Sequence, residues 1–88
     1  MSELPTITGF LHYLAQAAAL DEPSPSGQMT TYLLLVDMPP GGNSIPMQEA
    51  AARAFLHNHG HREGETLSVI GEPDLVGAQA VIRVSQVL

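Results

Sequence analysis

The chain has 88 residues and a formal net charge of −6, with nine acidic residues against three arginines and no lysine. This length corresponds to one domain, and the hydrophobic share of 44% is enough for a core, which must be aliphatic because the chain has only two tyrosines and two phenylalanines. The absence of cysteine excludes disulfides, thiolate nucleophiles and thiolate metal ligands. So few basic residues argue against a partner held through phosphate contacts and against an anionic membrane surface.

The segment Thr6–Leu20 has apolar residues on both faces of an alternating pattern. Its first half has high β propensity, so we expect one long strand with Gly9 at a bend or bulge. Helix formers dominate Ala15–Leu20, and Phe10, Leu14, Ala17 and Ala18 fit a helical stripe, so helix is the alternative for residues 10–20. The stretch Phe10–Leu20 also resembles the apolar part of a signal peptide, but no positive charge precedes it. No apolar run reaches the ~18 to 20 residues that span a bilayer, and we expect a soluble, cytoplasmic protein.

The next segments are a loop, a strand and a turn. Asp21–Gly27 contains two prolines, two serines and a glycine, which predict a loop. Gln28–Met38 is the clearest strand, and its run Leu33–Val36 offers apolar groups to both faces. The pattern leaves open which face of this strand is buried, because a one-residue change of register exchanges the faces. Pro39–Asn43 predicts a sharp turn.

The alanine-rich segment Met47–His59 is predicted to form a helix, and this is the strongest local prediction in the chain. Ser44–Pro46 is either a very short strand or the approach to this helix, with Ser44 as its cap and proline tolerated in the first turn. Gly60 suits the left-handed position that ends a helix. The predicted buried face consists of Met47, Ala51, Ala54 and Phe55, widened by Leu56.

Two strands are predicted after the helix. Glu65–Glu72 is the first, Pro73–Gly77 is the connecting turn, and Ala78–Val87 is a strand with alternating apolar residues.

This order of elements resembles the OB-fold superfamily of small barrels. The features that carry the resemblance are Gly9 early in the first strand, Asp37 at the end of a hydrophobic strand, and the segment Arg62–Val87, which has a glycine before the fourth strand and another at its end. The resemblance implies a mainly β domain on the border with α+β over residues 1–88. Its architecture would be a five-stranded Greek-key barrel with the helix between strands 3 and 4.

An OB-like domain that binds single-stranded nucleic acid uses aromatic platforms and a basic groove. Tyr32 and Tyr13 are the candidate platforms, although Tyr32 is as readily a packed residue with its hydroxyl satisfied. Arg83 is the candidate phosphate contact, although a lone strand arginine is more often solvated or paired with an acid. We expect Phe55 to lie in the core.

His57, His59 and His61 form the pattern H-x-H-x-H, and imidazole is a common ligand of zinc, copper and nickel. Gly60 interrupts the helix between the last two, so we favour a polar helix end over a metal site. No serine lies in a nucleophile motif. We therefore expect neither an enzyme nor a cofactor.

Two functions remain. The first is a module that binds protein, either another copy of itself in a homo-oligomer or a different chain, through interface candidates Leu33, Leu34, Leu35 and Val36. The alternative is a domain that binds single-stranded nucleic acid through Tyr13, Tyr32 and Arg83, as an accessory replication, plasmid or phage-type protein. Charge and the shortage of aromatic residues favour the first, and the fold resemblance favours the second.

Overall fold

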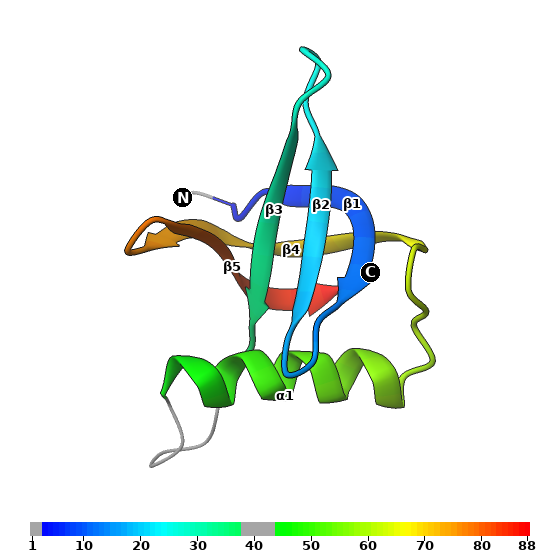
Figure 1. The fold of residues 1–88 in the computed structure, drawn as a ribbon, viewed down its shortest axis with the longest axis vertical. Coiled ribbons are helices and arrows are strands. Elements are labelled where there is room, and N and C mark those ends of the chain that lie inside the picture. Colours follow the sequence, from blue (N-terminus) through cyan, green and yellow to red (C-terminus); the bar gives the residue numbers. More distant parts are fainter. Residues whose placement is uncertain (1–2, 38–43) are drawn as a thin grey trace.

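In the computed structural model, which describes residues 3–37 and 44–88, strands close into a barrel in the order β1-β2-β3-β5-β4 (Figure 1). All neighbours are antiparallel except β3 and β5, which are parallel. The predicted mainly β barrel with its helix between the third and fourth strands is confirmed. The predicted turn Pro39–Asn43 lies outside the described residues. The elements are β1 (Thr6–Tyr13), β2 (Ala18–Pro23), β3 (Met29–Leu35), α1 (Ile45–Asn58), β4 (Thr66–Val76) and β5 (Gln79–Val87).

The prediction of one long strand over Thr6–Leu20, and its helical alternative, are both wrong. The segment is a hairpin in which Tyr13 pairs with Ala18, and the Leu14 amide donates to the Ala17 carbonyl at 2.8 Å across the turn. Ala18 and Ala19 are completely buried. Small side chains suit this tightly enclosed wall of the barrel, and their burial there overrides the helix propensity of alanine.

The loop predicted at Asp21–Gly27 begins later than expected because β2 continues through Pro23. Asp21, Glu22 and Pro23 pair with β3. Pro23 is tolerated because its nitrogen points away from β3, on the side where β1 has already left β2, so that no ladder hydrogen bond is lost.

The turn predicted at Pro73–Gly77 is also wrong. β4 continues to Val76, which pairs with Gln79, and the turn is Gly77–Ala78. Gly77 has a φ of +62°, the left-handed conformation that tight hairpin turns require. The extended hairpin forms because β5 offers a pairing partner along its whole first half, which the turn-like composition of this segment does not reveal.

Gly9 allows β1 to pass close to β2. A Cβ atom at this position would lie 2.4 Å from the Asp21 carbonyl oxygen. β1 pairs with β4 up to Phe10 and with β2 from Phe10 onward, and it bends between the two neighbours (Figure 1), as predicted. The register irregularity of the barrel lies elsewhere, between Ile70 and Gly71.

The core fills the barrel, and α1 covers one end of it (Figure 1). Within the described chain, the helix buries Gln48, Ala52 and Leu56. The predicted face is therefore wrong by one residue, and Met47 and Phe55 are exposed. Alanines on every side leave the apolar stripe undefined, so that docking selects the face on which Ala52 permits close approach and Leu56 fills the opening. The buried core residues are Ile7, Leu11, Ala18, Leu20, Leu34, Ala52, Leu56, Leu67, Val69 and Ile82.

Both ends of α1 have the features that the sequence predicts. The helix begins two residues earlier and ends one residue earlier than predicted. Ser44 is the N-cap residue, although its side chain makes no capping hydrogen bond, and proline occupies the first turn. At the other end Gly60 has a φ of +82°. The amides of Gly60 and His61 donate to the carbonyls of His57 and Leu56, which is the hydrogen-bond pattern of a Schellman motif.

Candidate functional site

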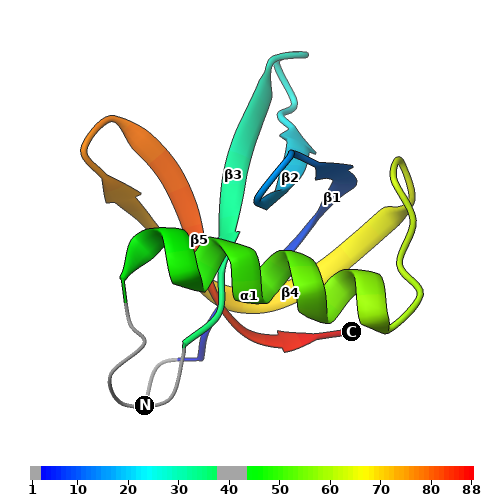
Figure 2. The same cartoon turned by 60° about the horizontal axis from the view of Figure 1, so that its bottom comes forward.

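The barrel is closed by a short pairing between β3 and β5, which we call the seam. Leu33, Leu34 and Leu35 pair with Val81, Ile82 and Arg83. Within the described residues, the first half of β3 pairs with β2 but has no strand paired on its other edge. The β2–β3 and β4–β5 hairpins diverge beyond the seam, as Figure 2 shows. Residues Met29–Tyr32 therefore form a free strand edge facing the second hairpin.

The backbone at Thr31 points toward this opening. Its carbonyl oxygen accepts a hydrogen bond of 3.4 Å from the side-chain amide of Gln79, which also donates to the Ala80 carbonyl. The Thr31 hydroxyl donates to Asp21 at 2.7 Å, and such close side chains are typical of the pair in an antiparallel ladder that exchanges no backbone bonds. The amide and carbonyl of Thr31 are thus directed away from β2, and the Gln79 side chain occupies the place of a strand partner.

A shallow groove of about 430 Å³ lies in this opening. We call it the mouth groove, and its lining residues are Tyr32, Pro73, Asp74, Leu75 and Ala80. Tyr32 is half-buried against the core, whereas 67% of Leu75 is exposed. Met29, which is 54% exposed, lies outside the groove on the other face of β3. Apolar side chains so exposed beside a free strand edge are the usual marks of a binding surface.

The charge around the mouth groove is acidic. Glu22 pairs with Thr30 and Leu20 pairs with Tyr32, so the alternation of β2 and β3 places Glu22 on the same face as Tyr32. Asp74 lies on the opposite wall, where its carboxylate is 3.3 Å from the Nε of Arg83. The Leu75 amide and the Arg83 guanidinium, in that order, lower the pKa of Asp74, so this wall keeps its carboxylate ionised.

A smaller crevice of about 100 Å³ lies at the other end of the seam, beside α1. Val36, Val84 and Val87 line it from the barrel, and Phe55 lines it from the helix. Phe55, predicted as core, is 40% exposed and stacks on His59 with ring centroids 4.1 Å apart. This crevice is an incompletely covered part of the barrel end.

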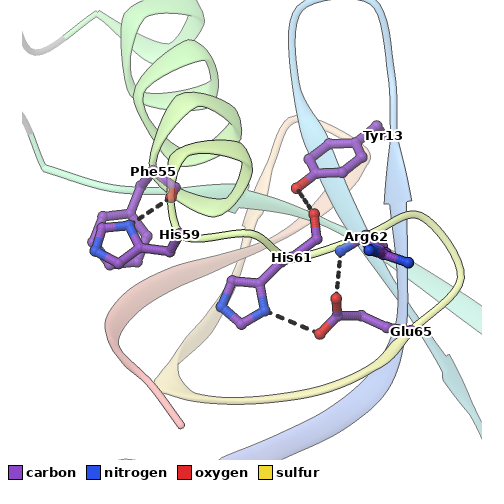
Figure 3. A network of polar contacts seen from close by, with 6 residues as sticks. All are labelled: Tyr13, Phe55, His59, His61, Arg62 and Glu65. Carbon is purple, nitrogen blue, oxygen red and sulfur yellow. Dashed lines mark hydrogen bonds and ion pairs between the residues drawn. The ribbon is translucent and has the colours of Figure 1, made fainter.

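Tyr13, a predicted stacking platform, instead fastens the connection between α1 and β4 to the end of β1 (Figure 3). Its hydroxyl donates to the His61 carbonyl at 2.8 Å, and its amide donates to Glu63 at 2.8 Å. The Arg53 guanidinium lies 5.2 Å from the ring centroid. Burial, followed by the nearby Glu65 carboxylate, raises the pKa of Tyr13. The hydroxyl hydrogen bond and the Arg53 guanidinium engage the ring within the molecule.

The three histidines point to different partners rather than to a common centre. His57 meets the edge of Tyr13, with centroids 6.5 Å apart, and the Nδ1 of His59 is 2.8 Å from the Phe55 carbonyl. The Nδ1 of His61 is 3.0 Å from Glu65 (Figure 3). No group of three or more His, Asp or Glu side chains in the described part of the chain could hold a metal ion.

The other sequence candidates fall into two groups. Leu34 and Leu35 are buried and Leu33 and Val36 are half-buried, so of these four interface candidates only the last two retain surface for a partner. Arg83 has a carboxylate partner in Asp74. Only Tyr32, of all the candidates, lies in the mouth groove.

Sequence reasoning missed Leu75, Met29 and Phe10, which are all exposed. Leu75 was assigned to a turn, and Met29 lies at the start of a strand, where its burial could not be deduced. For Phe10 a signal existed, since it alternates with Ile7, Gly9 and Leu11 in β1 and takes the face opposite to their buried side chains.

Comparison with protein-family models, with curated proteins and with solved structures found no match for this chain. Among the residues that the structure describes, no helix is both long and apolar enough to cross a membrane. The functional interpretation therefore depends on the geometry of the seam and its two flanking openings.

Proposed function

We propose that this chain is a non-enzymatic protein-interaction module with an OB-like barrel. The strand order with a parallel β3–β5 closure and the helix between β3 and β4 support the OB-like assignment. One observation carries the functional proposal: the free edge of β3 lies beside the exposed side chains of Met29 and Leu75. A strand edge offers main-chain hydrogen bonds, and the neighbouring apolar groups offer contact area.

The electrostatics favour a protein partner over a polyanion. The net charge is −6, and two of the three arginines already have partners, because Arg53 donates to the Leu14 carbonyl and Arg83 contacts Asp74. Phosphate binding would need several basic side chains that converge on one surface. Single-stranded nucleic acid is the second candidate, and the position of Tyr32 in an open groove at the barrel mouth supports it.

An array of ten-residue peptides probed with labelled protein tests the first proposal. We expect the wild type to bind a subset of the peptides, and Leu75→Ser to lose most of this signal. Leu4→Ser is the matched control, since it also removes an exposed leucine but lies outside the mouth groove. Sedimentation of the same variants detects binding to a second copy. If no peptide is bound and the protein sediments as a monomer, the proposal is wrong.

A fluorescence-anisotropy titration with a labelled single-stranded oligonucleotide tests the second candidate. Nucleic-acid binding predicts an affinity that falls steeply with salt and weakens in Tyr32→Ala by about 1–3 kcal/mol, the contribution of one stacked base. No binding by micromolar protein at about 50 mM salt would exclude this candidate.

A further inference from the structure

We propose that the mouth groove binds an extended, positively charged segment of another protein, laid along the free edge of β3. This inference rests on the interaction module proposed above and identifies the chemistry of its partner. It follows from the backbone at Thr31, the carboxylates in and beside the groove and the position of Gln79.

The backbone supplies the first argument. The carbonyl of Thr31 points into the opening and is held by a side-chain amide at 3.4 Å, long for a hydrogen bond. A strand that pairs with Met29–Tyr32 would replace this contact with regular backbone bonds. Because the Gln79 side chain extends from the first residue of β5 and is exposed, it can swing away without disturbing the seam. Gln79 is thus a weak internal competitor for the site.

The charge supplies the second argument. Asp74 lines the groove, and Glu22 lies beyond the lining on the face of the sheet that carries Tyr32. The only basic side chain that contacts a lining residue in the described part of the chain is Arg83, and it is paired with Asp74. A segment with lysine or arginine would complement these carboxylates and the net charge of −6. An acidic segment, a nucleic acid or a second copy of this acidic chain would meet repulsion.

The apolar groups supply the third argument. Side chains of an added strand alternate between two faces, so that alternate residues would lie over Tyr32 and Leu75 while the residues between them face solvent or Asp74. The preferred segment therefore alternates apolar and basic residues over the length of the free edge.

Isothermal titration calorimetry with four eight-residue peptides tests this inference on the full chain. In three of them valine alternates with lysine, glutamine or glutamate, and in the fourth four lysines precede four valines. We expect the alternating lysine peptide to bind and the alternating glutamate peptide not to bind. The glutamine peptide and the block peptide should bind at least about threefold more weakly, as expected for the loss of one exposed ionic or apolar contact.

Three variants locate the binding. Asp74→Asn should weaken binding of the alternating lysine peptide about threefold, whereas Glu49→Gln, which also removes one negative charge but lies on α1, should leave this binding unchanged. Gln79→Ala should tighten it, because the internal competitor is removed. Equal affinity for the lysine and glutamate peptides, or equal weakening by both charge variants, would overturn the inference.

A failure of the basic-segment inference can be distinguished from a failure of the proposed interaction module. If none of the four peptides binds but the peptide array gives a signal that depends on Leu75, the basic-segment inference is wrong and the interaction module stands. If the array is also negative, both are wrong.

Discussion

Glu65 shows how a single side chain fixes a connection in this protein. One carboxylate oxygen accepts a hydrogen bond from the Arg62 amide, and the other lies 3.0 Å from the Nδ1 of His61 (Figure 3). Its backbone carbonyl accepts from the Leu11 amide at 2.9 Å. The hydrogen bond from His61, followed by that from Arg62, lowers the pKa of Glu65. The carboxylate therefore holds the connection after α1 in place, and the backbone carbonyl of the same residue joins this connection to β1.

A pH dependence follows from this lowered pKa. A carboxyl group with a lower pKa in the folded protein contributes stability above its unfolded pKa, about 4.3, and loses it as the pH falls through the folded value. We expect Glu65→Gln to melt below the wild type at pH 7 and the difference in Tm to shrink as the pH falls below the unfolded pKa. Thermal unfolding followed by circular dichroism at several pH values measures this difference. A difference that stays constant down to pH 3 would show that ionisation of Glu65 has no part in stability.

At the scale of elements, α1 is the part whose existence was predictable and whose orientation was not. Its alanines, the following glycine and the proline in its first turn all indicate a helix, and the structure has one at Ile45–Asn58. Four alanines lie on different sides of it, so the apolar pattern cannot select one face. Only the shape of the barrel end decides that Leu56 is buried and Phe55 is not.

This orientation predicts different effects for two neighbouring truncations. Leu56 is 2% exposed and belongs to the core, so Leu56→Ala should reduce the free energy of unfolding by about 2–5 kcal/mol. Phe55→Ala removes a larger side chain from a half-open position and should cost less, about 1 kcal/mol. Urea unfolding of both variants measures the two values. A larger effect for Phe55 would mean that the helix docks through the face predicted from sequence.

The strand boundaries show the same division between local and tertiary information. The alternating residues of β5 and the hydrophobic run of β3 are visible in the sequence, and both strands form where expected within a few residues. The hairpin at Tyr13–Ala18 and the extension of β4 past Pro73 are not visible. Alanine there favours helix, and proline with aspartate favours a turn, but pairing with β1 and β5 prevails in the folded chain.

At the scale of the whole molecule, the barrel is closed along most of its circumference and weakly closed at the seam. Three consecutive residues of β3 pair with β5, and an opening lies at each end of that pairing. The sequence predicted the barrel and placed Tyr32 on the relevant strand. It could not predict the mouth groove, because the groove arises where two hairpins distant in sequence diverge, and neither hairpin's length was predictable from composition.

The central claim is that the first half of β3 is a free edge, and amide hydrogen exchange followed by NMR tests it most directly. Alternation in the β2–β3 ladder directs the Thr30 and Tyr32 amides to β2 and the Thr31 amide into the opening. We predict that Thr31 exchanges at least about tenfold faster than Thr30, Tyr32 and Leu34. If Thr31 is as strongly protected as its neighbours in dilute protein, its edge is already covered and the account of the site is wrong.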